Sequence, residues 1–230
     1  MRPRRGARRR SCSSASSPPS RLSRPREPSK KRRATYQDVL DAPEHVVAEI
    51  IGGELRLSPR PGGSATAVAS SLGDELGPPF KRGRGGPGGW LILFEPELHL
   101  ADEIVVPDLA GWRRERQPRA PEGAFFTLAP DWVCEVLSRS TEKMDRLEKM
   151  PIYASWGVQH AWLIHPRRRT IEVFRLCNSA WEAIGVYVEA DRARIEPFGA
   201  IEIAVADLWA DAPLPTRASE EPGHYEHGWY

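Results

Sequence analysis

The chain has 230 residues, of which 40% are hydrophobic and eight are Trp, which is enough to bury one good core. Its formal net charge of +2 conceals an uneven distribution. Residues 1–33 hold 13 Lys/Arg and one acid, which leaves 20 basic and 30 acidic side chains, a net charge of −10, for residues 34–230. The composition therefore excludes a broadly basic, phosphate-binding domain and confines that signal to the leader.

Cysteine usage and hydropathy indicate the cellular compartment in which we expect the protein. The three cysteines (Cys12, Cys134 and Cys177) form neither a disulfide framework nor a CxxC metal pair. No segment approaches the roughly 18 apolar residues of a membrane span, and the Arg-rich start lacks the apolar region of a signal peptide. We therefore expect a cytoplasmic protein with no membrane partner.

The domain organisation follows from composition. Residues 1–33 are rich in Arg, Ser and Pro and have almost nothing to bury, so we expect a disordered basic leader. Three interpretations of the leader stay open: a solvated tail, a start-site extension that the domain does not need, and a basic arm that contacts nucleic acid. One folded domain is expected over residues 34–211, followed by a flexible C-terminal tail over residues 212–230.

The first half of the domain contains clear start and turn signals. Thr35 and Asp38 have the spacing of a capping box, which predicts a short helix at that point. Gly52-Gly53 joins two short apolar runs and predicts a β-hairpin. Apolar residues at helical spacing predict a helix over 65–76. The other segments expected in this half are a basic glycine-rich loop and two strands, at 81–89, 90–94 and 97–100.

The second half is dominated by strands. The segment 104–112 is apolar except for Asp108, and the preceding Pro107 predicts a bend or an edge position there. The further strands expected lie at 132–137, 160–164, 170–176, 181–188 and 202–205. The pattern over 131–165 is strand, helix, strand.

One buried acid and one helix in that stretch carry the chemistry that we expect. Glu135 is the polar exception in an apolar strand, and an isolated buried carboxylate costs several kcal/mol unless it is paired, protonated or bound to a metal. In the helix that follows, Asp145 and Lys149 are four residues apart and share a face. Because this face continues to Trp156, we expect it to turn inward. Pro151 cannot donate a backbone hydrogen bond, so a kink is expected near it.

Three acids occupy apolar surroundings: Glu49, Asp108 and Glu135. Mg²⁺ prefers oxygen ligands, and two carboxylates with substrate phosphate oxygens form a usual site for it. A bound metal stabilises charge at phosphorus, and a nearby ammonium such as that of Lys149 can orient the attacking water.

Simpler roles stay open for the same residues. Asp108 could cap a turn, Glu135 could pair with a buried Arg, and Asp145 with Lys149 could form a surface pair worth ~0.2–0.5 kcal/mol. The histidines show no HxxxH or HxH spacing for zinc, and no GxSxG elbow indicates a serine hydrolase.

Several ordered motifs resemble one family. They are EIIGGEL, SPRP, GGWLILFEPELHL, VVPDLAGWRRER, APDWVCEVLSRST, DRLEKMPIY and GVQHAWLIHP. Together they resemble the Uma2 family of the PD-(D/E)XK nuclease superfamily, over about Thr35 to Trp209. The resemblance implies a single α/β (α+β) domain of the restriction-endonuclease-like type, with a mixed central β-sheet flanked by helices.

The resemblance also implies roles for individual residues. Asp108 matches the aspartate of the PD motif, and Glu135 matches the acid of the (D/E)XK strand. Leu137 stands where that motif has its lysine, and Lys149 on the following helix matches the displaced lysine. Glu49 corresponds to an early acid of the family and a third metal ligand, and Asp145 to an accessory acid on the helix.

Two functional hypotheses follow. The first is a Mg²⁺-dependent endonuclease, with Mn²⁺ as a substitute ion, that hydrolyses nucleic acid, DNA in preference to RNA. The second is a catalytically silent module of the same fold that binds nucleic acid or a protein partner, which the acidic domain favours. A homodimer is left open by the resemblance, because many nucleases of this superfamily pair.

Overall fold

The computed structural model describes residues 32–212. The predicted leader and tail fall almost wholly on residues 1–31 and 213–230, which lie outside the described residues, so both stay predictions. Among the helices within 32–212, none combines the length and the apolar character needed to cross a membrane.

A six-stranded mixed sheet forms the centre of the fold, with strand order β10-β9-β8-β7-β6-β3. Its strands are β3 (Trp90–Phe94), β6 (Leu109–Arg113), β7 (Trp132–Val136), β8 (His160–His165), β9 (Thr170–Cys177) and β10 (Ala180–Val188). Within this sheet β7 and β8 run parallel, and the other neighbouring pairs run antiparallel. The parallel pair is the strand–helix–strand unit that the sequence predicts.

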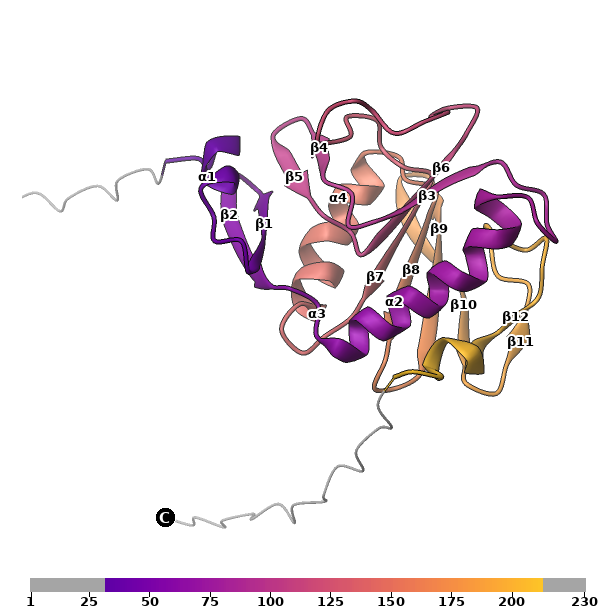
Figure 1. Ribbon diagram of the computed structural model, residues 1–230. Coiled ribbons are helices and arrows are strands. Elements are labelled where there is room, and N and C mark those ends of the chain that lie inside the picture. Colours follow the sequence, from indigo (N-terminus) through magenta and orange to yellow (C-terminus); the bar gives the residue numbers. More distant parts are fainter. Residues whose placement is uncertain (1–31, 213–230) are drawn as a thin grey trace, which may run out of the picture. The chain divides into compact units, whose positions relative to one another are not determined.

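Helices cover both faces of this sheet (Figure 1). One face packs against α2 (Gly63–Leu76) and the 3₁₀ helix η3 (Val205–Trp209). The other packs against α4 (Met150–Ser155). The chain reaches α4 through α3 (Glu142–Met144) and the π-helical turn η2 (Asp145–Lys149). The predicted mixed sheet flanked by helices is confirmed.

Strand β7 shows how the two faces are assigned. Side chains alternate along a strand, and Trp132, Cys134 and Val136 contribute to the core under α2. Val133 and Leu137 contribute to the core under α4. Glu135 has the same parity as these two residues, so it faces α4 rather than α2.

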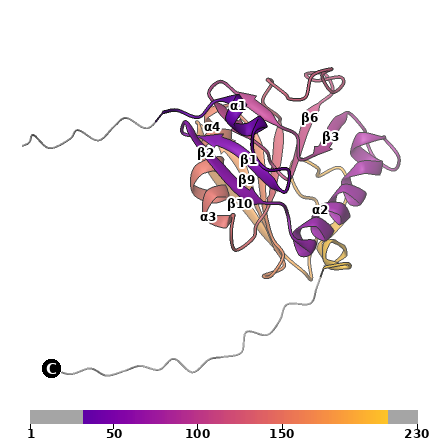
Figure 2. The ribbon, with the colours of Figure 1, turned by 60° about the vertical axis from the view of Figure 1, so that its left-hand side comes forward.

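A second, four-stranded sheet has the order β2-β1-β5-β4 and was not foreseen as separate. Figure 2 shows its strands β1 and β2 side by side. Its strands are β1 (Val46–Ile51), β2 (Glu54–Pro59), β4 (Leu98–Leu100) and β5 (Glu103–Val105). The predicted hairpin is confirmed, because Gly52 and Gly53 make its turn with φ of 62° and 78°, which glycine adopts without steric cost. The short helix α1 (Tyr36–Leu40) begins after Thr35, where predicted. The remaining strands are β11 (Arg192–Ala193) and β12 (Ile203–Ala204).

The chain passes from one sheet to the other at Pro107. It leaves the four-stranded sheet after Val105 and enters the six-stranded sheet at Leu109. The predicted bend is confirmed, and it leaves the N–H and carbonyl of Val106 and the N–H of Asp108 outside both ladders, where side chains can bind them.

The helix after β7 departs from regular α geometry where Pro151 enters it. Proline offers no N–H to the carbonyl of Leu147, and the preceding turn is π-helical, with the Met150 N–H donating to the Asp145 carbonyl. The extra residue in that turn rotates the helix beyond it. The prediction that Trp156 turns inward is therefore wrong: its exposed fraction is 41%, whereas Tyr153 is fully buried.

Candidate active site

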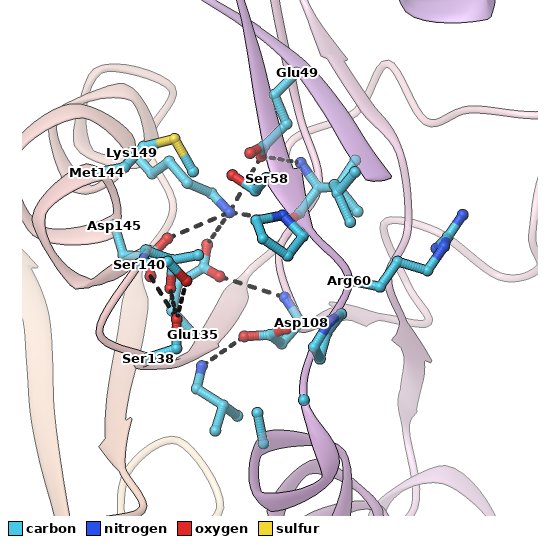
Figure 3. Close-up of a pocket in the computed structure, with 18 residues that line it drawn as sticks. Glu49, Ser58, Arg60, Asp108, Glu135, Ser138, Ser140, Met144, Asp145 and Lys149 are labelled. Atoms are coloured by element: carbon cyan, nitrogen blue, oxygen red, sulfur yellow. Dashed lines mark hydrogen bonds and ion pairs between the residues drawn. The ribbon is translucent and has the colours of Figure 1, made fainter. Parts of the chain in front are cut away.

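A cavity of about 330 Å³ lies where the two sheets and the π-helical turn meet (Figure 3). The five residues that the sequence singled out all line it: Glu49, Asp108, Glu135, Asp145 and Lys149. The structure thus brings together every predicted site residue.

Each acid reaches the cavity from a different element. Glu49 comes from β1 of the four-stranded sheet, Asp108 from the bend before β6, and Glu135 from the middle of β7. Asp145 and Lys149 are the first and last residues of the π-helical turn. The interpretation of Asp145 and Lys149 as a surface pair is wrong, because each residue is only 3% exposed.

The Lys149 ammonium lies at the centre of the buried charges (Figure 3). Its Nζ lies 2.9 Å from Glu135 Oε1, 3.2 Å from Glu49 Oε1 and 3.7 Å from Asp145 Oδ1. It also donates a 2.9 Å hydrogen bond to the Val106 carbonyl. One cation therefore holds three carboxylates and the bend between the sheets in a single network.

The carboxylates of Asp108 and Glu135 each contact a backbone N–H group at or next to the other residue. The Val136 N–H donates to Asp108 Oδ2 at 2.6 Å, and the Asp108 N–H makes a long 3.4 Å contact with Glu135 Oε2. Within residues 32–212, Asp108 Oδ1 accepts no hydrogen bond. Each of the two acids thus keeps one carboxylate oxygen with little or no protein donor.

The electrostatics of the pocket favour partial protonation of these acids. Burial, with a further contribution from the charge of Glu135, raises the pKa of Asp108 to about 7. Burial also raises the pKa of Glu135 to about 7 in spite of the opposing charge of Lys149, and that of Asp145 to about 6. Four carboxylates line the pocket with the Lys149 ammonium and with Arg60, which pairs with Glu95, so the fully ionised pocket carries an excess of negative charge.

The lysine stays protonated. Burial by itself lowers the pKa of the Lys149 ammonium, but the carboxylates of Glu135 and Glu49 outweigh burial and raise that pKa well above its ordinary value. A permanently protonated ammonium can donate hydrogen bonds and stabilise negative charge, and it cannot serve as a general base.

Tyr153 belongs to the same network and was not predicted. Its hydroxyl donates a 2.6 Å hydrogen bond to Glu135 Oε1. The signal in the sequence is its position four residues after Lys149, but the regular-helix face that we drew from Asp145 passes through Ile152 instead. The π-helical turn moves that face by one residue and selects Tyr153.

The donor set suits a hard divalent cation. Asp108 Oδ1 and Glu135 Oε2 are oxygen ligands of the kind that Mg²⁺ prefers, and the excess negative charge would be relieved by a cation. Within the described range, no group of three or more His, Cys, Asp or Glu side chains is arranged to hold a metal by itself. The residues present therefore fit an open site of two carboxylates that water and substrate oxygens complete.

Fold and pocket together define a restriction-endonuclease-like α+β domain with a carboxylate–lysine site. The chain belongs to the Uma2 family, described as "Putative restriction endonuclease", which matches residues 34–206. A solved structure from Anabaena variabilis, described as "a putative nuclease belonging to DUF820", is similar at a TM-score of 0.62 and 27% sequence identity. The alignment covers 77% of this chain and 98% of that one. A comparison with curated proteins found no match.

Proposed function

We propose that this protein is a Mg²⁺-dependent endonuclease that hydrolyses phosphodiester bonds of DNA in preference to RNA, with Mn²⁺ as a substitute ion. The observation that supports the proposal is the convergence of Asp108, Glu135, Glu49 and Lys149 on one cavity from separate elements. Family membership and the similarity to the Anabaena protein support the same class of reaction.

Asp108 and Glu135 would hold the metal through the oxygens that lack a strong protein donor, and Glu49 would assist. When bound, the ion supplies Lewis-acid stabilisation at phosphorus and lowers the pKa of a coordinated water. The chain fixes both acids before any ligand arrives. The Val136 N–H orients Asp108, and the Tyr153 hydroxyl and the Lys149 ammonium orient Glu135.

Lys149 would position the attacking water and stabilise charge on the phosphate oxygens. Before a substrate binds, its ammonium is held by ion pairs with Glu135 and Glu49 and by a hydrogen bond to the Val106 carbonyl. It would become available to the attacking water when the bound metal takes up one of these carboxylates. The charge of Asp145, at 3.7 Å, would help to keep this ammonium protonated. Such preorganised charge acts where it needs no rearrangement during the reaction.

The test is cleavage of labelled single-stranded DNA, duplex DNA and RNA with Mg²⁺ or Mn²⁺. Asp108→Asn, Glu135→Gln and Lys149→Met should each lower the rate by at least about 100-fold, the size expected for removing one electrostatic contact. Activity that survives both Asp108→Asn and Lys149→Met would dispose of this site.

Asp131, the residue before β7, provides a matched control. Asp131 is a buried acid next to β7 that accepts hydrogen bonds from the Arg113 N–H and Arg116 Nη1, and it does not line the cavity. Asp131→Asn should reduce stability and leave the cleavage rate of the folded protein unchanged. The comparison separates loss of chemistry from loss of structure.

The second candidate is a catalytically silent module of the same fold. It is favoured by the net charge of −10 over residues 34–230 and by the ion pairs that already engage three of the carboxylates with Lys149. Calorimetry with Mg²⁺ and Mn²⁺ on the wild type and Glu135→Gln discriminates between the two. A silent module should show no heat of binding that depends on Glu135.

A further inference from the structure

A second cavity, of about 260 Å³, adjoins the carboxylate cavity. Ser138 lines both of them, so the two cavities are neighbours across this side chain. The second cavity is lined mainly by polar and charged residues: Arg139, Glu142, His165, Arg167 and Arg168. An acidic cavity therefore opens directly beside a basic one.

The position of the basic cavity follows from the parallel pairing of β7 and β8. Parallel strands end at the same edge of a sheet, and the Leu137 N–H still donates to the Ile164 carbonyl at 2.7 Å where the two strands leave the sheet. Beyond that bond the first chain segment continues to Arg139 and the second to Arg167 and Arg168. Two segments far apart in the sequence therefore deliver their arginines to one edge, next to Glu135.

The three arginines are free to bind an anion. Arg139, Arg167 and Arg168 are exposed, and within residues 32–212 none of their guanidinium groups has a hydrogen bond or ion pair. Some other exposed arginines of the domain, such as Arg60 and Arg192, pair with glutamates instead. What distinguishes these three cations is their position beside the carboxylate cavity, where a local positive charge can hold an anionic substrate.

The one acid of this cavity does not neutralise them. Glu142 Oε1 accepts a 3.0 Å hydrogen bond from Arg146, which also binds Glu172 through two hydrogen bonds of 2.8 and 2.6 Å. Glu142 Oε2 faces His165 Nε2 at 3.8 Å. The acid is thus engaged by Arg146 and His165.

The turn that carries two of these arginines is anchored at both ends. At its start, His165 Nδ1 accepts a hydrogen bond from the Arg168 N–H at 3.2 Å, so the neutral ring carries its proton on Nε2. At its end, Arg169 has a φ of 52° and its guanidinium binds Glu189. Arg167 and Arg168 therefore project from a fixed turn.

We infer that Arg139, Arg167 and Arg168 form a phosphate-binding subsite for the nucleic-acid strand that passes through the carboxylate cavity. The inference rests on the proposed function and extends it, because it names the surface that holds substrate on an otherwise acidic domain. Because Ser138 lines both cavities, a strand held in the basic cavity would run next to the cavity that holds Asp108 and Glu135. Arginine suits this role because its planar guanidinium binds phosphate oxygens in pairs.

The test measures how binding depends on salt, using the full chain in an Asp108→Asn background so that no probe is cut. Fluorescently labelled 20-nucleotide single-stranded DNA, its duplex and the matching RNA are titrated at a series of NaCl concentrations with Mg²⁺ present. The slope of log Kobs against log[NaCl] changes by about 0.7 to 0.9 for each phosphate that the protein no longer neutralises. R139A/R167A/R168A should therefore flatten the slope by about 2 to 3, and R139K/R167K/R168K should keep it.

The control removes the same number of cations elsewhere. Lys81, Arg82 and Arg84 lie beyond the C-terminal end of α2, whose 14 residues extend away from Gly62 of the carboxylate cavity. At 1.5 Å per residue this places them about 20 Å from the cavity. K81A/R82A/R84A should leave the slope unchanged.

Three outcomes overturn the inference: an equal slope in the triple arginine variant, an equally flattened slope in the control, or no binding of any probe to the parent protein. The assay involves no cleavage, so the two proposals can fail separately. Cleavage with a slope that ignores the arginines removes the subsite alone. An arginine-dependent slope without any cleavage by the wild type removes the nuclease alone.

Discussion

The substitution Asp108→Asn should stabilise the metal-free protein at neutral and alkaline pH. The pKa of this carboxyl is raised from 3.8 to about 7 by burial and by Glu135. A pKa raised by about three units corresponds to a loss of about 4 kcal/mol in the free energy of unfolding once the carboxyl is ionised. Because the side chain is only partly buried and water reaches it, we expect half of this loss, about 2 kcal/mol. An amide keeps the shape and can still accept the Val136 N–H, while the charge is removed.

The difference in stability between Asp108→Asn and the wild type should depend on pH. Below pH 3.8 the group is protonated in both folded and unfolded chains, and it costs nothing. As pH rises towards 7 the unfolded chain loses this proton first, so the wild type loses stability across that window and the variant does not. The difference should be near zero at pH 4 and about 2 kcal/mol at pH 8, equivalent to about 4–8 °C in Tm.

Thermal and urea unfolding in EDTA at several pH values provides the measurement. Asp131→Asn is the control of opposite sign, because it removes a carboxylate that accepts two hydrogen bonds and should cost about 1–3 kcal/mol. Parallel pH profiles for the wild type and Asp108→Asn, or a less stable Asp108→Asn at pH 8, would refute the electrostatic description. Added Mg²⁺ should stabilise the wild type and not the variant.

Three further outcomes are expected. Arg146→Gln should destabilise the domain by about 1 kcal/mol at pH 7. Because Arg146 lowers the pKa of Glu172, the deficit in thermal unfolding should begin to shrink as pH falls through the ordinary value of 4.5 and should be lost once pH is below the lowered pKa of Glu172 in the folded protein; a deficit that does not shrink with pH contradicts the pairing. Tyr153→Phe removes a hydrogen bond that lowers the pKa of Glu135, so calorimetric Mn²⁺ binding should need a higher pH than in the wild type, and an unmoved midpoint counts against this. Deleting residues 1–33 should leave retention on immobilised DNA unchanged over a range of salt; a clear loss would identify the leader as a nucleic-acid arm.

Local signals were strong enough to place most elements. The Gly52-Gly53 turn, the capping box at Thr35 and the bend at Pro107 each depend on neighbouring residues alone, and each was found where predicted. The four-stranded sheet was not foreseen as separate, because Ile50 pairs with Ile104 across a distance in sequence that no local pattern encodes.

For the candidate site, too, local sequence predicts some features and tertiary packing sets the others. The sequence by itself determined that Glu135 is an acid in an apolar strand, that Asp108 follows a proline bend, and that Lys149 comes one short helix later. These are properties of composition and spacing. Family motifs then proposed the roles of these residues.

Only the tertiary structure decided what these charges meet. The bend at Pro107 turns Asp108 towards Glu135, and the π-helical turn aims Lys149 and Tyr153 at the same carboxylate. The parallel ends of β7 and β8 bring arginines to the adjoining edge. The physical reason is that helix and strand propensities act over a few residues, whereas a charged pocket is set by the packing of segments tens of residues apart.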